Sequence, residues 1–129
     1  MKHTRIALIL GLCLPLAVSA QNRISGWDTD KITSAEVQFS VPDVETTSFS
    51  FQERTDLDVI LSFLKGVEFR PWEPDSLVAP EDRECHIVFQ GQRDQVYLWS
   101  RSACIGKTSF GIDLSVLSDF EDLVGRLGR

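Results

Sequence analysis

The segment from Cys85 to Cys104, CHIVFQGQRDQVYLWSRSAC, restricts the possible folds of this chain more than any other stretch. Apolar residues alternate with other residues on both sides of positions 91–94, whose glycine and polar side chains are typical of a turn. This pattern predicts a β-hairpin with one apolar face, as a half-buried antiparallel pair requires. The register that we expect pairs Phe89 with Val96 and Ile87 with Leu98.

The same register sends the alternate side chains of the hairpin to the opposite face. That face carries two large aromatic residues and an arginine, which are residue types that binding hot spots use. We therefore predict a binding surface there, extended by a tryptophan from a proline-rich loop. The candidate binding residues are His86, Val88, Tyr97, Trp99, Arg101 and Trp72. An alternative interpretation is that Trp27 or Trp72 folds over this face and makes it a second small core.

Residues 1–20 have the pattern of a secretory signal peptide. Basic residues precede an apolar run at 6–16, and the small residues at 18–20 are typical of a cleavage site. The apolar run is too short for a membrane-spanning helix, which needs about 20 residues. The sequence therefore predicts export to the periplasm or the extracellular medium. We expect the mature chain to begin at Gln21 and not to insert into a membrane.

Removal of the signal peptide leaves Cys85 and Cys104 as the cysteines of the mature chain. An even number of cysteines in an oxidising compartment favours an intramolecular disulfide. A disulfide that closes a loop of about 20 residues stabilises a fold by roughly 3 kcal/mol through the lost entropy of the unfolded chain. The pair lacks the CxxC spacing of redox-active thiols, so we predict a structural bond.

The mature chain is acidic. It keeps all 19 acidic residues but 11 of the 13 basic ones, because Lys2 and Arg5 leave with the signal peptide, and its net charge is therefore −8. An acidic surface repels phosphate backbones and anionic headgroups, so nucleic acid and membrane partners are disfavoured. A basic protein partner is permitted.

The remaining patterns predict further strands and two helices. Alternation indicates strands at 33–41, 48–52 and 106–113. Amphipathic stretches indicate a helix capped by Thr55 and another that begins near Ser118, or as early as Ser115.

These elements define an α+β fold, an antiparallel sheet of about five strands in the order ββαβββα, with both helices packed on one face. We expect residues 21–32 to form an extended lead-in. A single domain then spans 33–129, with a proline-rich loop at about 70–84.

The sequence offers few groups for catalysis. His86 is the histidine of the mature chain, and no nucleophile elbow, phosphate loop or calcium loop is complete. The carboxylates that begin the two helices are explained by capping. We therefore expect no enzyme activity, no cofactor and no metal site.

Binding is the function that these patterns favour. We predict an exported recognition protein of the inhibitor, immunity or accessory type, which binds another protein through the hairpin face and the proline-rich loop. The alternative is a carrier of a small apolar ligand, with Trp72, Tyr97 and Trp99 around its pocket.

Overall fold

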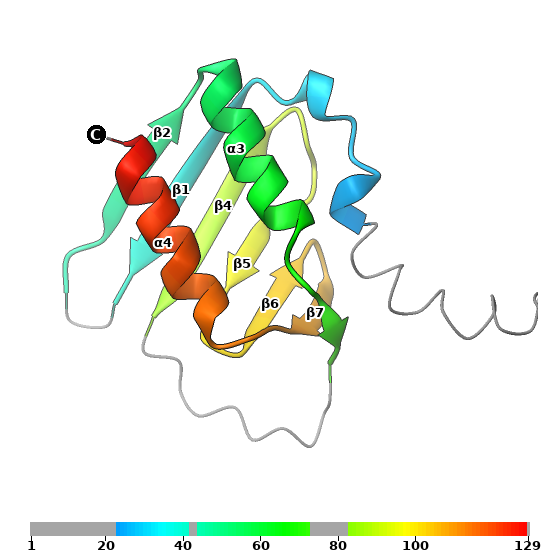
Figure 1. Cartoon of the computed structure of the whole chain (residues 1–129), viewed down its shortest axis with the longest axis vertical. Helices are drawn as coiled ribbons and strands as arrows, with labels where there is room; N and C mark the ends of the chain where they lie inside the picture. Colours follow the sequence, from blue (N-terminus) through cyan, green and yellow to red (C-terminus); the bar gives the residue numbers. More distant parts are fainter. Residues whose placement is uncertain (1–22, 42–43, 73–82, 129) are drawn as a thin grey trace, which may run out of the picture.

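An antiparallel sheet with two helices on one of its faces makes up this chain (Figure 1). The computed structural model describes residues 23–41, 44–72 and 83–128. Within them the strands are β1 (Ser34–Ser40), β2 (Thr47–Phe51), β3 (Arg70–Pro71), β4 (Glu84–Gln90), β5 (Val96–Leu98), β6 (Ser102–Ile105) and β7 (Thr108–Gly111). The helices are the short 3-10 helix η1 (Thr29–Lys31), α3 (Arg54–Lys65) and α4 (Ser115–Leu127).

The predicted fold class is confirmed, but the sheet has more strands than we expected. Its order is β2-β1-β4-β5-β6-β7-β3, and every neighbouring pair is antiparallel. The predicted second strand of the hairpin is in fact two strands. The chain reverses after β5, where the Trp99 amide donates to the Ser102 carbonyl at 2.8 Å, and it returns as β6. The short edge strand β3 adds a further difference.

The register between β4 and β5 differs from the predicted one by two residues. Val96 pairs with Ile87 rather than with Phe89, and Leu98 pairs with Cys85. The loop before β5 is therefore longer than the expected turn. A shift of two positions leaves each side chain on its expected face, because side chains alternate with a period of two.

Helices α3 and α4 cover the apolar face because their buried residues recur with helical spacing. Those of α3 are Leu57, Ile60, Leu61 and Leu64, and those of α4 are Leu117, Phe120 and Val124. The predicted caps Thr55 and Ser118 are wrong, whereas the alternative start of the second helix near Ser115 is confirmed. The N-cap positions are Glu53 and Leu114, and neither makes a side-chain capping bond. The C-cap positions are Gly66 and Gly128.

The core extends into the lead-in, which is not the extended segment that we expected. Residues 23–25 form a helical turn and η1 follows. Ile24 and Ile32 are 0 % exposed, and Trp27 packs edge-on against Phe89 with ring centroids 5.6 Å apart. The lead-in thus contributes side chains to the core between helices and sheet.

Two predicted segments, the signal peptide at 1–20 and most of the proline-rich loop, lie outside the described residues. Among the residues that are described, no helix has the length and apolar character needed to cross a membrane.

Candidate functional site

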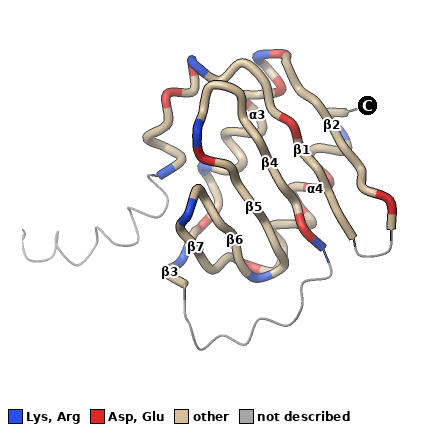
Figure 2. Tube along the Cα trace, turned by 180° about the vertical axis from the view of Figure 1, so that it is seen from behind, with Lys and Arg blue, Asp and Glu red and all other residues tan. Residues whose placement is uncertain are grey.

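The candidate site is the face of the sheet opposite α3 and α4, which we call the open face. Figure 2 views the molecule from this side, with the strands in front of the helices. Strand registers place one row of open-face residues across six strands, from β2 to β7. The row is Ser48, Gln38, His86, Tyr97, Cys104 and Ser109. Acidic and basic residues gather mostly at strand ends and loops in this view, and β5 and β6 carry none.

The centre of the open face is an aromatic stack formed by His86, Tyr97 and Trp99. The rings of His86 and Tyr97 lie 4.3 Å apart with an interplanar angle of 7°, because these residues are directly opposite each other on β4 and β5. The rings of Tyr97 and Trp99 are 5.6 Å apart at 10°. All three side chains are half-buried. The stack is therefore a supported surface with its outer parts in solvent.

Polar partners hold both ends of the aromatic stack. Trp99 donates from Nε1 to Oε1 of Glu84 at 3.0 Å. His86 Nε2 lies 2.7 Å from Oε1 of Gln95, and since a carbonyl oxygen only accepts, Nε2 carries the proton in this contact. These bonds orient the outer rings. Sequence reasoning missed Glu84 and Gln95. Glu84 could have been found, because it lies two residues before His86 on the same strand and alternation therefore places both side chains on the same face.

The other predicted site residues are only partly brought together. Val88 lies on the same face of β4 and is 36 % exposed. Arg101 is exposed in the turn between β5 and β6, where its carbonyl accepts from the Ile112 amide. Trp72 follows β3, so β6 and β7 separate it from Tyr97. Three strand spacings correspond to about 14 Å, so Trp72 is not a strand neighbour of Tyr97.

The predicted disulfide between Cys85 and Cys104 is wrong, because both thiols are free. Cys85 lies on β4 with its side chain in the core, whereas Cys104 lies on β6 and shares the open face with Tyr97. Strand β5 runs between them, which separates the backbones by about 9.6 Å, beyond the reach of a disulfide. Counting cysteines could not reveal this separation, since it depends on the turn that creates β6.

Burial raises the pKa of the Cys85 thiol, and the carboxylates of Glu121 and Glu84 raise it further. The thiolate is the nucleophilic form of cysteine, so this group stays inert in the folded protein. The face of β4 that points into the core therefore carries no reactive group of its own.

Trp27 does not cover the open face. Its ring packs on Phe89, whose side chain belongs to the core on the opposite side of the sheet. The alternative interpretation in which Trp27 closes the aromatic face is therefore wrong.

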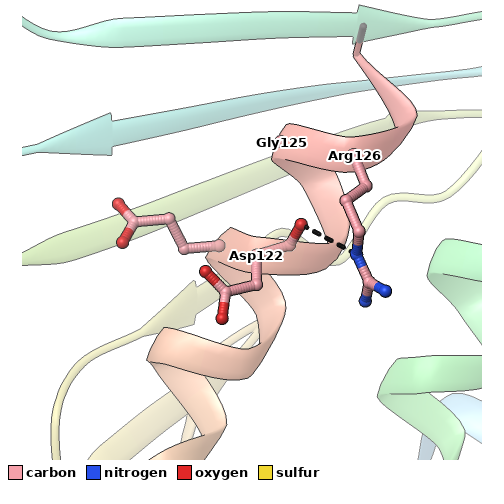
Figure 3. Close-up of a pocket in the computed structure, with 4 residues that line it drawn as sticks. Asp122, Gly125 and Arg126 are labelled. Carbon is pink, nitrogen blue, oxygen red and sulfur yellow. Dashed lines mark hydrogen bonds between the residues drawn. The ribbon is translucent and has the colours of Figure 1, made fainter.

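A shallow pocket lies elsewhere, on the outer side of α4 (Figure 3). It is lined by Glu121, Asp122, Gly125 and Arg126. Arg126 Nε donates to the Asp122 carbonyl within the helix at 3.4 Å, and Glu121 accepts from Arg83. The charged side chains of Arg126 and Glu121 therefore already have partners within the protein. Across the described ranges, no group of three or more His, Cys, Asp or Glu side chains is arranged to hold a metal ion.

Comparison of the chain with protein-family models, with curated proteins and with solved structures finds no match. The open face is therefore the feature of the molecule from which we infer a function.

Proposed function

We propose that this chain is an exported recognition protein, of the inhibitor, immunity or accessory type, which binds another protein through the open face. The aromatic stack is the observation that carries the proposal. Its rings are stacked on one another and oriented by Glu84 and Gln95. Aromatic side chains held in one orientation lose little conformational entropy when a partner covers them, and they supply most of the contact energy of many interfaces.

The arrangement of polar groups supports a binding role. His86 is paired with an amide oxygen, and Trp99 engages the Glu84 carboxylate through a nitrogen that only donates. Both contacts hold ring surfaces in place at the open face. The stack thus has the organisation of a binding anchor.

The alternative function, transport of a small apolar ligand, has less support. Its pocket requires Trp72 beside Tyr97, and these residues belong to separate parts of the sheet. We therefore base the experiment on a protein partner.

The test is affinity capture with the mature domain from the envelope and culture fluid of the source organism, read by mass spectrometry. We expect Tyr97→Ala with Trp99→Ala to weaken capture by at least about 30-fold, which corresponds to roughly 2 kcal/mol for the loss of hot-spot side chains. Urea unfolding checks that the variant remains folded.

The matched control replaces exposed apolar residues away from the open face. Val59 on α3 and Leu114 before α4 are 40 % and 62 % exposed, and Val59→Ala with Leu114→Ala should leave capture unchanged. Equal capture by the Tyr97/Trp99 variant and the native domain would remove the open face from the binding function. Equal loss in both variants would locate the interface elsewhere.

A further inference from the structure

The two edges of the sheet differ in how they are protected. Strand β3 has two residues, Arg70 and Pro71, and proline has no backbone N–H to offer an incoming strand. Arg70 also places a charged side chain on this edge, where Nη1 contacts Oδ1 of Asp113 at 2.8 Å. Short length, proline and charge are the devices by which natural sheets prevent further pairing. This edge is closed.

Strand β2 forms the opposite edge and has none of these devices. Its sequence, TSFSF, contains no charged residue and no proline over five positions. It pairs with β1 on one side, and in the described part of the chain no strand lies on the other. Alternate N–H and C=O groups of β2 therefore point outward along an extended backbone. Val44, just before the strand, is 62 % exposed.

Carboxylates flank the edge strand β2. Glu45 precedes β2 and Glu53 follows it, and both are exposed. Acidic segments are visible near both ends of β2 in Figure 2. Glu36 lies beside Ser50 on the adjacent strand and adds a third exposed carboxylate.

The nearest cation in sequence, Arg54, is already engaged by other groups. It contacts Oδ1 of Asp58 at 3.1 Å and the carbonyl of Ile32 at 3.0 Å. The edge therefore combines an uncharged centre with acidic ends.

This charge pattern disfavours a second copy of the chain as the occupant. An antiparallel pair of β2 strands centred on Phe49 would place each Glu45 opposite the Glu53 of the other copy. Like charges directly opposite one another destabilise an antiparallel pair. Positively charged residues at the ends of an incoming strand would instead face carboxylates in either strand direction.

We propose that β2 accepts an extended segment of a partner protein as a further strand of the sheet. The segment carries lysine or arginine at both ends of an uncharged stretch of about five residues, the length that matches β2. Backbone hydrogen bonds supply the pairing and the end charges supply the selectivity. This site goes beyond the proposed function, because it uses the sheet edge and not the open face.

The experiment uses a short synthetic peptide of alternating threonine and valine with two lysines at each end. Nuclear magnetic resonance follows the amides of residues 47–51 in the ¹⁵N-labelled mature protein. At saturation we expect alternate β2 amides to exchange with solvent at least about tenfold more slowly, because each gains a hydrogen bond. The same peptide with glutamates at its ends should produce no protection.

The decisive variant is Glu45→Lys with Glu53→Lys. This variant should bind the lysine peptide about tenfold more weakly, because the two lysines that replace Glu45 and Glu53 would repel the lysines at the peptide ends. It should also bind the glutamate peptide, whose end charges would now be opposite in sign to those of the protein. The matched control is Asp30→Lys with Glu68→Lys, which changes the net charge equally at exposed positions away from β2. It should bind the lysine peptide like the native protein.

Several outcomes would overturn the proposal. Protection of β2 in the free protein together with a dimer in sedimentation would show that a second copy occupies the edge. If neither peptide protected the β2 amides, Glu45 and Glu53 would serve only to prevent strand pairing at this edge. If both charge variants weakened binding of the lysine peptide equally, the peptide would be held by long-range electrostatic attraction and not by pairing with β2. The Tyr97→Ala, Trp99→Ala variant should keep peptide binding, so failure at the edge and failure of the open-face function remain distinguishable.

Discussion

Burial of a single thiol couples the stability of this protein to pH. Cys85 is 0 % exposed, and desolvation, followed by the charges of Glu121 and Glu84, raises its pKa. In the unfolded chain a cysteine loses its proton near pH 8.5. Because the folded pKa is raised, the stability from the protonated thiol is fully present below that pH and is lost as the pH rises above it.

We predict that the native protein loses about 1.4 kcal/mol more stability per pH unit above about pH 9 than Cys85→Ala does, because one proton separates its folded and unfolded states. Urea unfolding at pH 8, 9 and 10 measures the difference between the two proteins. Lysine and tyrosine titrations are common to both and cancel. Parallel stability curves would contradict the assigned pKa direction.

The pH experiment requires that Cys85 is a free thiol, and chemical modification of the cysteines can test this. Alkylation of the mature chain, which lacks Cys13, in denaturant without reductant should add two groups, one at Cys85 and one at Cys104. In the folded protein near pH 8 only Cys104 should react quickly, since it is the partly exposed thiol. Detection of a disulfide-linked pair of peptides that contain Cys85 and Cys104 would contradict the free thiols of the structure.

Strands β4 and β5 show which properties of an element can be predicted from its sequence. Alternation assigned His86, Tyr97 and Trp99 to one face, and the structure places them on one face. Alternation could not assign the register, because a shift of two residues preserves every face. The ring that stacks directly on His86 is therefore that of Tyr97. The two cysteines, which were expected to form a disulfide, lie on different faces of the sheet because the chain turns after β5 and returns as β6.

For the helices too, the buried face could be predicted from the sequence pattern, whereas the first residue could not be assigned from the capping signals. Their buried faces follow from spacing, and both helices end at a glycine C-cap. The cap signals at Thr55 and Ser118 did not set the helix starts, because packing of an apolar face outweighs one capping bond of about 1 kcal/mol. The helices begin at Arg54 and at Ser115, and the second of these was the expected alternative. Fold class could thus be predicted, whereas strand number and helix starts depended on turns and packing that only the folded chain reveals.

The loop between β4 and β5 gives a prediction at this scale. Gly91 has a φ of 98°, and a Cβ there would overlap the carbonyl of Lys31. We expect Gly91→Ala to destabilise the protein by at least about 2 kcal/mol, since both backbone strain and displacement of the lead-in contribute. Urea unfolding measures the change.

Gly125 in α4 is the matched control, because apart from its chain neighbours and the backbone of its own helix no atom lies within 4 Å of a Cβ built there. Gly125→Ala should stabilise the protein by about 0.5 to 1 kcal/mol through helix propensity. A neutral Gly91→Ala beside a stabilising Gly125→Ala would mean that the close approach of Lys31 to the loop is not maintained in solution.

At the scale of the whole molecule, the sheet and helices do not account for all of the core. The lead-in before β1 closes one side of it with Ile24 and Ile32, both 0 % exposed. Arg23 then connects this segment to the far part of the sheet through Oγ1 of Thr108 and the carboxylate of Asp94. A domain boundary at residue 33 would therefore remove part of the folding unit.

We predict that deletion of residues 21–32 prevents cooperative folding, and that Ile24→Ala and Ile32→Ala each cost about 2 to 4 kcal/mol. Two such losses approach the total stability of a typical domain, roughly 5 to 15 kcal/mol. Circular dichroism during urea unfolding measures both effects. Asp28→Ala serves as the control, because its contact with Lys31 at 3.8 Å is an exposed ion pair that contributes little. If the shortened chain unfolded cooperatively at the native midpoint, the lead-in would be an accessory segment, and the core would begin at β1 as the alternation of apolar residues alone suggests.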